Sequence, residues 1–252
     1  MIRLVNVYKS FGSHRVLQGC SLDVQDGETL TIIGGSGTGK SVTMKLMIGL
    51  LKPDRGQVFV DDQEITAMDE DQLAEVQKKF AYIFQMGALF DSMTVGENVA
   101  FGLQQLHKYD KKKTQDIVSK TLALVGLGGI ERLKPSELSG GMRKRVAIAR
   151  AVAMSPKYLF YDEPTTGLDP IMSDVINDLI VQLHEKLGTT GVVVTHDMKS
   201  AYKISSRIAM LYEGRIVQVD TPDHIRESKD PLVHQFITGS AQGPIQMKVK
   251  AY

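Results

Sequence analysis

Four short runs of apolar residues constrain the fold of this chain more than any other feature. The runs read TLTII, FAYIF, YLFY and VVVT, and they lead into Gly34, Gln85, Asp162 and His196 respectively. Continuous apolar runs of this length are typical of strands that are buried on both faces of a parallel sheet. Because ligands bind beyond the carboxyl ends of such strands, we expect these four residues to converge on one crevice.

Two other regions have different patterns. Residues 1–28 alternate short apolar runs with turn signals, which favours antiparallel strands. Residues 86–157 lack the strand pattern. Within them, Thr94 and Glu97 have the spacing of a capping box, and residues 117–125 carry apolar side chains at helical spacing. We therefore expect an antiparallel β part at the N-terminus and a helical insert between the second and third buried strands.

The last part of the chain predicts smaller elements. After His196 the sequence favours a short helix and then a hairpin that turns at Glu213 and Gly214. A last helix is expected to end near Thr238, and the tail beyond it contains Gly and Pro and is expected to be irregular.

Together these patterns predict one α/β domain. Its core comprises residues 1–85 and 158–238, its helical subdomain residues 86–157 and its tail residues 239–252. The length of 252 residues, of which 42% are hydrophobic, is sufficient for a sizeable core.

Composition excludes several classes of protein. Lys and Arg number 30 and Asp and Glu 29, so the net charge is +1 and no global field draws the chain to nucleic acid or anionic lipid. The one cysteine, Cys20, rules out a disulfide framework within the chain and suits a reducing compartment. The sequence has neither a signal-peptide pattern nor a run of about 18 apolar residues, so we expect a cytosolic globular protein with no nucleic-acid partner.

Residues 34–41, GGSGTGKS, fit the phosphate-binding pattern G-x-x-x-x-G-K-[ST]. Glycines let successive backbone N–H groups cradle phosphate oxygens, and the following helix adds its positive N-terminal end. We expect Lys40 to reach the β- and γ-phosphates and Ser41 to place its hydroxyl on Mg²⁺. The alternative, a glycine-rich turn without a ligand, does not account for the position directly after a buried strand. The expected nucleotide contacts are Gly34, Gly35, Ser36, Gly37, Thr38, Gly39, Lys40, Ser41 and Val42.

Two adjacent acids follow the third apolar run. Asp162 is placed to hold Mg²⁺, directly or through water, and Glu163 to polarise an attacking water. The alternative is a surface acidic pair. Two acids with different roles favour hydrolysis by water over transfer to another substrate. The absence of an N-K-x-D run favours ATP over GTP.

The motifs together resemble the ATP-binding cassette (ABC) ATPases. The phosphate loop, Gln85, LSGGM at 138–142, YDEP at 161–164, TGLDP at 166–170 and His196 occur in the family's order and spacing. The resemblance covers essentially the whole chain. It implies an ABC-type P-loop NTPase with a mostly parallel core sheet, an N-terminal antiparallel β subdomain and a helical subdomain.

The resemblance also implies that two cassettes meet head to tail, with ATP between the phosphate loop of one copy and the signature motif of the other. Ser139, Gly140 and Gly141 would then approach the γ-phosphate held by the partner. The alternative is a helix cap of small residues packed within one subunit. The family usually has Gln where this chain has Met142, and a thioether cannot make the hydrogen bonds of an amide. The basic residues 143–145 are expected to contact phosphate or to form ion pairs with the partner.

Further roles follow residue by residue from the resemblance. Gln85 resembles the Q-loop glutamine that senses Mg²⁺, and Asp169 the D-loop residue that crosses to the opposite site. His196 resembles the switch histidine that contacts the γ-phosphate and the attacking water. Phe11 is expected to stack on adenine, with Tyr8 as the alternative. The expected catalytic residues are thus Glu163, His196, Lys40 and Gln85, and the expected metal ligands are Ser41, Gln85 and Asp162.

Three longer segments of the chain are similar to one subfamily. The segments FQMGALFDSMTVGENVAFGL, PSELSGGMRKRVAIARA and HQFITGSAQGPI resemble the ATPase of Mla-type phospholipid transport systems of Gram-negative envelopes, which shares the methionine of the signature. The resemblance implies a homodimer at the cytoplasmic face of the inner membrane, bound to an integral-membrane permease. It further implies a STAS-domain regulator and a periplasmic Mce-domain protein. Residues 86–103 would receive the permease, and the tail after Gly239 would reach the neighbouring cassette.

The expected function is therefore that of a motor that hydrolyses ATP to move phospholipids between the inner and outer membranes and so maintains outer-membrane lipid asymmetry. Two alternatives remain at this stage. One is the ATPase of another ABC importer or exporter, and the other is a soluble assembly ATPase of the iron–sulfur scaffold type.

Overall fold

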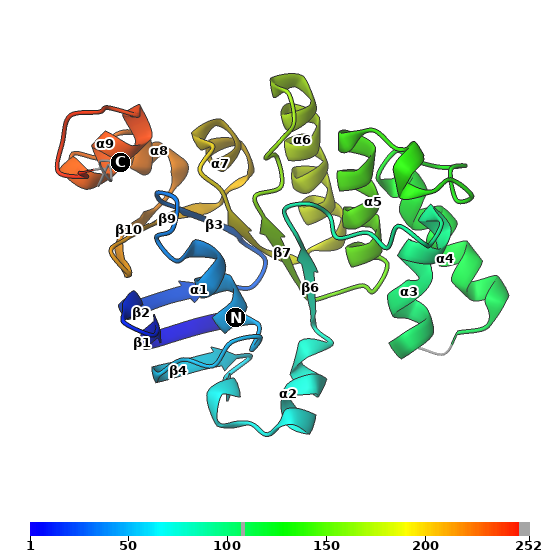
Figure 1. Cartoon of the computed structure of the whole chain (residues 1–252), viewed down its shortest axis with the longest axis horizontal. Helices are drawn as coiled ribbons and strands as arrows, with labels where there is room; N and C mark the ends of the chain where they lie inside the picture. Colours follow the sequence, from blue (N-terminus) through cyan, green and yellow to red (C-terminus); the bar gives the residue numbers. More distant parts are fainter. Residues whose placement is uncertain (107–108, 247–252) are drawn as a thin grey trace.

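The computed structural model describes residues 1–106 and 109–246, which form two sheets and the helices around them (Figure 1). The strands are β1 (Ile2–Phe11), β2 (His14–Val24), β3 (Thr29–Ile33), β4 (Arg55–Val60), β5 (Gln63–Glu64), β6 (Phe80–Ile83), β7 (Tyr158–Asp162), β8 (Thr190–Val194), β9 (Arg207–Tyr212) and β10 (Arg215–Asp220). The helices are α1 (Lys40–Met47), α2 (Glu70–Gln77), α3 (Val95–Leu106), α4 (Lys111–Leu124), α5 (Gly140–Val152), α6 (Pro170–Leu187), α7 (Met198–Ile204), α8 (Pro222–Arg226) and α9 (Pro231–Thr238). Short 3₁₀ turns lie at Ile65–Ala67 and Pro135–Glu137. None of the helices in these two ranges is both long enough and apolar enough to cross a membrane.

The larger sheet contains the four apolar runs, in the strand order β10-β9-β3-β8-β7-β6. β3, β8, β7 and β6 pair in parallel, which confirms the expected mostly parallel core, and β9 adds a further parallel strand beside β3. β3 and β8 are buried along their whole length, but β6 is mostly half-buried. The expectation that FAYIF is buried on both faces is therefore wrong, because β6 is the edge strand of this sheet. It also ends at Ile83, before Phe84.

The smaller sheet is antiparallel and has the order β2-β1-β4-β5, as the turn signals near the N-terminus predict. α1 lies between the two sheets. Its Met44, Leu46 and Met47 are fully buried in one core with Leu4 of β1 and Val192 of β8. Burial of α1 on both sides fixes the loop that precedes it at the carboxyl end of β3.

α3, α4 and α5 occupy the region for which the sequence predicts a helical insert, at the right of Figure 1. Thr94 and Glu97 exchange the two hydrogen bonds of the predicted capping box before α3. Val99 of α3 is buried in the same cluster as Leu159 of β7. The helices therefore share a core with the edge of the larger sheet, and α5 contacts both β6 and α6.

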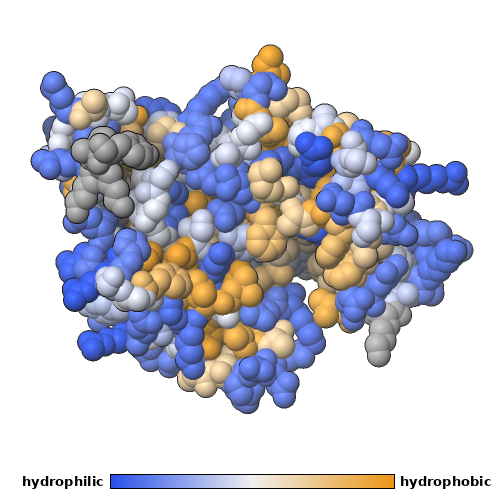
Figure 2. All heavy atoms as spheres, viewed as in Figure 1, coloured by the Kyte–Doolittle hydropathy of each residue, from blue (hydrophilic) through white to orange (hydrophobic). Residues whose placement is uncertain are grey.

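An apolar segment connects the larger sheet to these helices. Figure 2 shows that apolar residues gather over the middle of one face, whereas its outer ends are mainly hydrophilic. Between β6 and α3, Phe84, Met86 and Phe90 are exposed, and Met86 is 85% exposed. Exposed apolar side chains that gather on one surface are typical of contact surfaces.

The C-terminal part agrees with the sequence except for one helix. β9 and β10 turn at Glu213 and Gly214, and α9 ends at Thr238, as predicted. α8 was not expected; Pro at its first position and a threonine cap account for it. Residues 240–246 contain no helix or strand. Residues 247–252, with the predicted reach of the tail to a neighbouring cassette, lie outside the described residues.

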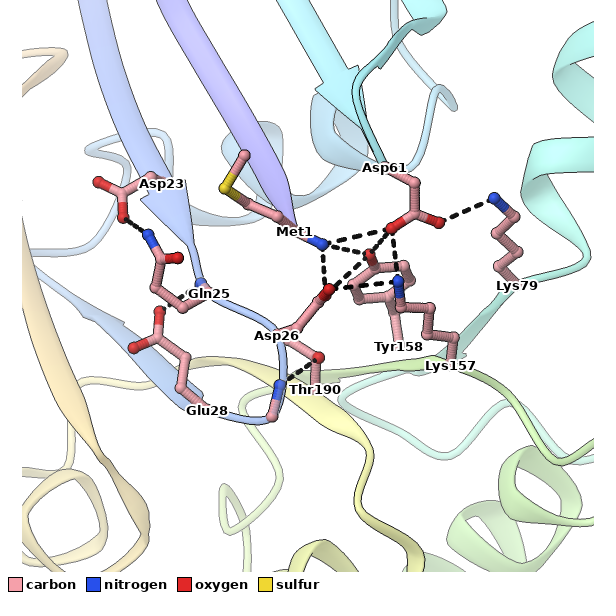
Figure 3. A network of polar contacts seen from close by, with 11 residues as sticks. Met1, Asp23, Gln25, Asp26, Glu28, Asp61, Lys79, Lys157, Tyr158 and Thr190 are labelled. Atoms are coloured by element: carbon pink, nitrogen blue, oxygen red, sulfur yellow. Dashed lines mark hydrogen bonds and ion pairs between the residues drawn. The ribbon is translucent and has the colours of Figure 1, made fainter.

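Asp61, in the turn after β4, joins the two sheets (Figure 3). Its carboxylate accepts hydrogen bonds from the hydroxyl of Tyr158 (2.5 Å) and from the ammonium groups of Lys157 (2.5 Å) and Lys79 (2.8 Å). Burial alone would raise the pKa of Asp61, but these hydrogen bonds outweigh burial and hold its pKa below the ordinary value. The ionised carboxylate thus links the smaller sheet to the starts of β6 and β7.

Candidate active site

The phosphate loop follows β3 directly, and close contacts require its glycines. A Cβ on Gly34 would lie 2.4 Å from the carbonyl oxygen of Leu211, and one on Gly39 would lie 2.8 Å from a methyl group of Val16. Gly39 is also the N-cap of α1, with a left-handed φ of 103°. A larger residue at either position would force the loop away from the sheet.

Lys40, the first residue of α1, lies beneath the loop and is only 8% exposed. Its ammonium donates hydrogen bonds to the carbonyl oxygens of Gly34 (2.9 Å) and Gly35 (3.0 Å). Burial lowers the pKa of Lys40, and the negative charges of Glu163 and Asp162 oppose this shift. The lysine therefore places its ammonium group against the loop that is predicted to cradle phosphate.

Two hydroxyl groups hold Asp162 at the end of β7. Ser41 Oγ donates to Oδ1 at 3.0 Å, and the Tyr82 hydroxyl donates to Oδ2 at 2.7 Å. Burial, and then the bond to Asp162, raises the pKa of Tyr82, so its hydroxyl remains a donor. Ser41 and Asp162, two of the three predicted Mg²⁺ ligands, are thus in direct contact. The third, Gln85, lines the same cleft.

Glu163 follows at a left-handed position, with φ of 50°. Its backbone amide donates to the carbonyl of Val194 in β8 (2.9 Å), which anchors the turn. His196 Nδ1 lies 2.9 Å from its carboxylate, and the Thr166 hydroxyl donates to that carboxylate at 3.1 Å. The Glu163 side chain is only 14% exposed. A carboxylate oriented in this way can accept a proton from a water molecule in the cleft.

These groups line one cleft of about 410 Å³. Its lining consists of Phe11, Val16, Ser36, Gly37, Gly39, Lys40, Ser41, Val42, Gln85, Asp162, Glu163 and His196. Three of the four predicted strand-end residues therefore meet in it, while Gly34 is buried under the loop. Gly35 and Thr38 bond to each other within the loop at 2.9 Å. Phe11 is 49% exposed in the cleft, whereas the alternative aromatic, Tyr8, is not part of the lining.

Four predicted residues lie outside the cleft, at the N-termini of α5 and α6. Ser139 is the exposed N-cap of α5, and its hydroxyl accepts a bond from an amide of the first turn (3.3 Å). Gly140 is exposed beside it. Gly141 is buried, and a Cβ there would lie 2.3 Å from the methyl group at the flexible end of the Met172 side chain. Asp169 caps α6 and is exposed.

Sequence reasoning missed two contacts of the predicted catalytic groups. Tyr82 gave no signal beyond its place in an apolar run, although its position in the strand beside β7 brings it to Asp162. Lys144 was expected to contact phosphate or a partner. It is instead buried, and its ammonium donates to the backbone carbonyls of Gln85 and Glu163. A run of three basic residues does not reveal which of them faces the core.

Comparisons with known proteins identify the family of the chain. Residues 17–166 match the family model described as ABC transporter. The chain is 42% identical to the chloroplastic protein TRIGALACTOSYLDIACYLGLYCEROL 3 of Arabidopsis thaliana, over 98% of this chain and 76% of the relative. It is 38% identical to the intermembrane phospholipid transport system ATP-binding protein MlaF of Escherichia coli (strain K12), over 95% of this chain and 89% of the relative. The dimeric post-hydrolysis structure of the ATP-binding cassette MJ0796, bound to ADP and Pi, matches with a TM-score of 0.80 and 32% identity over 88% of this chain and 99% of that chain.

Proposed function

The chain belongs to the ABC transporter family, and from this premise we propose that two copies of it form the ATP-hydrolysing motor of a membrane transporter. One observation carries the proposal: the groups needed at a triphosphate are split between two places. Lys40, Asp162 and Glu163 line the cleft, whereas Ser139 is the exposed N-cap of α5 outside it. A helix N-terminus whose capping hydroxyl is exposed and can still donate a hydrogen bond is suited to phosphate. A second copy docked head to tail would therefore complete the site.

In each site the residues have separate tasks. Phe11 stacks on adenine, and the loop amides with Lys40 bind the β- and γ-phosphates. Glu163 accepts a proton from the attacking water, and His196 orients that carboxylate and the water. The hydrogen bonds of Glu163 to His196 and Thr166 support this assignment, because they fix the carboxylate before substrate binds.

Mg²⁺ is part of the proposal, and the donor set suits it. Ser41, Asp162 and Gln85 would hold the ion, and their hydroxyl, carboxylate and amide oxygens are the hard ligands that Mg²⁺ prefers. Held there, Mg²⁺ would supply positive charge that offsets the negative charge of the phosphates. The hydrogen bond from Ser41 to Asp162 keeps these two proposed ligands side by side at the phosphate loop.

The partner copy supplies the remaining contacts. Ser139 and Gly140 meet the γ-phosphate held by the opposite chain, and Asp169 crosses to that site. Closure around ATP brings the two copies together, and hydrolysis releases them. Because α5 shares a core with α3, closure also moves residues 86–103, the segment proposed to receive the permease, in which Met86 and Phe90 are exposed.

The proposed cargo is phospholipid, moved between inner and outer membrane so that outer-membrane asymmetry is maintained. The relative MlaF supports this choice, since the match extends over nearly the whole of both chains. The proposed complex lies at the cytoplasmic face of the inner membrane. It contains the homodimer, an integral-membrane permease, a STAS-domain regulator and a periplasmic Mce-domain protein.

A native pull-down of the tagged chain from mildly solubilised membranes tests the proposal, with mass spectrometry of the proteins and lipids that co-purify. A multi-pass permease, an Mce-domain protein and bound phospholipid are the expected result. A different permease without lipid would retain the motor but overturn the cargo. Soluble scaffold proteins alone, with nothing from the membrane fraction, would overturn the transporter and favour an assembly ATPase.

A further inference from the structure

A buried lysine connects α5 to both loops of the proposed hydrolytic machinery. Lys144 lies about one helical turn after Gly140 and is only 7% exposed. Its ammonium donates to the carbonyl oxygen of Gln85 and, at 3.4 Å, to the carbonyl oxygen of Glu163. Lysine is almost never buried without partners, because removing the ammonium from water carries a large desolvation cost. These two bonds are therefore the reason that the charge is tolerated there.

Both acceptors are backbone atoms, and this determines what the lysine can do. Burial lowers the pKa of Lys144, and the nearby charges of Glu163 and Asp162 oppose that shift. A backbone bond leaves the side chains of Gln85 and Glu163 free to face the cleft. It fixes instead the positions from which those side chains extend. The lysine therefore acts on the placement of the catalytic groups and does not touch the substrate.

The three segments that meet at Lys144 come from different parts of the chain. Gln85 follows β6, Glu163 follows β7, and Lys144 is on α5, whose N-cap is Ser139. Any shift of the N-terminus of α5 relative to the larger sheet must strain or relieve the bonds to Gln85 and Glu163. The ammonium is thus a direct physical connection between the proposed contact with the partner's nucleotide and the chain's own hydrolytic groups.

We propose that Lys144 is a positioning residue that transmits the docking of α5 on the partner's nucleotide to Gln85 and Glu163 of its own chain. The inference rests on the function proposed above for these residues. Docking at Ser139 draws α5 into its closed position. Lys144 then sets the two backbone carbonyls so that Glu163 faces the attacking water. The connection makes hydrolysis in one site depend on occupation of the other.

A second cation of α5 offers a matched control. Arg150 donates to the carbonyl oxygens of Ala88 (2.7 Å) and Gly87 (2.8 Å), so it anchors the same segment a few residues beyond Gln85. It has the same type of contact, from the same helix to the same loop. None of its hydrogen bonds reaches Glu163 within residues 1–106 and 109–246.

The test compares Lys144→Met, Lys144→Arg and Arg150→Met in the full-length chain. Methionine keeps the apolar stem of Lys144 and removes its donors, whereas arginine keeps the charge and several donors. Steady-state ATP hydrolysis gives kcat and KM, and a fluorescent ATP analogue gives nucleotide affinity. ATP-dependent dimer formation is measured by size-exclusion chromatography in a Glu163→Gln background, where turnover is blocked.

We expect Lys144→Met to lower kcat at least about tenfold, because a misplacement of the catalytic carboxylate by a fraction of an ångström has effects of this size. We expect KM, the affinity for the analogue and dimer formation to stay within about twofold of the parent chain. The contacts that bind ATP in the ground state are unchanged. Lys144→Arg should recover most of the lost kcat. Arg150→Met should lower thermal stability but reduce kcat by no more than about threefold, because the Glu163 contact remains.

Three results would overturn the inference. One is a kcat for Lys144→Met close to that of the wild type. Another is an equal loss of kcat in Lys144→Met and Arg150→Met, which would show that Lys144 only anchors the loop that follows β6. The third is a loss of dimer formation together with kcat, which would place Lys144 in the interface. Absence of ATP hydrolysis by the wild-type chain itself would overturn the proposed function, and the inference with it.

Discussion

The cleft and the N-terminus of α5 contain the two halves of the proposed ATP site, and they differ in how complete each is within one chain. In the cleft, Lys40, Ser41, Asp162 and Glu163 already have hydrogen-bond partners from the same chain. At α5, Ser139 is exposed to solvent and separate from the cleft. The contacts of the cleft half are thus formed within one chain, whereas the proposed role of the α5 half requires a second copy.

This difference separates binding from turnover. In the proposed site, the cleft of a single chain supplies the groups that bind ATP and orient an attacking water. The donors proposed to close over the γ-phosphate lie outside that cleft, at the N-terminus of α5. Variants in the cleft should therefore impair the function of the chain that carries them. Variants at α5 should leave ATP binding to their own chain unchanged and impair hydrolysis in the site of the partner copy.

Glu163→Gln should have the largest effect. Glutamine keeps the shape of the side chain but cannot accept a proton, so turnover should fall by about 10²–10⁴-fold, the range expected for loss of a general base. ATP binding should persist, because Lys40 and the phosphate loop are unchanged. Initial rates of phosphate release and equilibrium binding of ATP measure the two quantities. Normal hydrolysis by this variant would remove Glu163 from the catalytic role.

Ser139→Arg should reduce turnover by about 100-fold, since a misplaced or lost transition-state donor costs this much, while binding of ATP to each chain stays unchanged. A mixing experiment sharpens the test. Lys40→Ala alone should also be inactive. A mixed dimer of the two variants contains one intact site, made from the phosphate loop of the first variant and Ser139 of the second. Mixing should therefore restore part of the activity, because the intact site still lacks the increase in rate that Lys144 transmits from an occupied second site.

The control for this experiment is each variant mixed with itself at the same total concentration. If the mixture is as inactive as its components, the head-to-tail arrangement is wrong. If Ser139→Arg loses ATP binding as a monomer, Ser139 belongs to the site of its own chain.

Tyr82→Phe should have a smaller effect that stays within the cleft. It removes the hydroxyl that donates to Asp162 at 2.7 Å and leaves the ring that packs beside Phe84. A hydrogen bond to a charged group contributes about 1.5–3 kcal/mol, of which part is recovered when water takes its place. We expect the Mg²⁺ concentration for half-maximal nucleotide binding to rise about threefold to tenfold. Titration of Mg²⁺ against binding of the ATP analogue measures it, and an unchanged midpoint would contradict the prediction.

The same difference explains what the sequence predicts well. Many residues that line the cleft are consecutive in the sequence or lie directly after apolar runs. The local pattern alone therefore predicts that Lys40, Asp162 and Glu163 lie at one site. Signals were weaker wherever tertiary packing decides. Burial of Lys144, the role of Tyr82 and the half-exposed state of β6 depend on which elements are neighbours in space. Likewise Gly141 is in contact with Met172, a neighbour that no local pattern reveals.

The smallest effect on activity is expected far from both halves, at the junction of the two sheets. Asp61→Asn removes the negative charge that accepts bonds from Lys79, Lys157 and Tyr158 (Figure 3). The free energy of unfolding should fall by about 2 kcal/mol, typical of hydrogen bonds to a charged group. KM and kcat for ATP should stay within about twofold of the wild type, because no residue of this junction lines the cleft. Urea unfolding and steady-state kinetics measure the two effects.

The pH dependence of this effect has a definite sign. The pKa of Asp61 is lower in the folded chain than its ordinary value near 3.9. Its stabilisation is therefore fully present above about pH 4 and is lost as the pH falls toward the folded-state pKa. The difference between wild type and Asp61→Asn should shrink over that window. Asp62→Asn, in the same turn with an exposed side chain, is the control and should change stability by less than about 0.5 kcal/mol. A pH-independent difference would show that shape, and not charge, holds the sheets together at this turn.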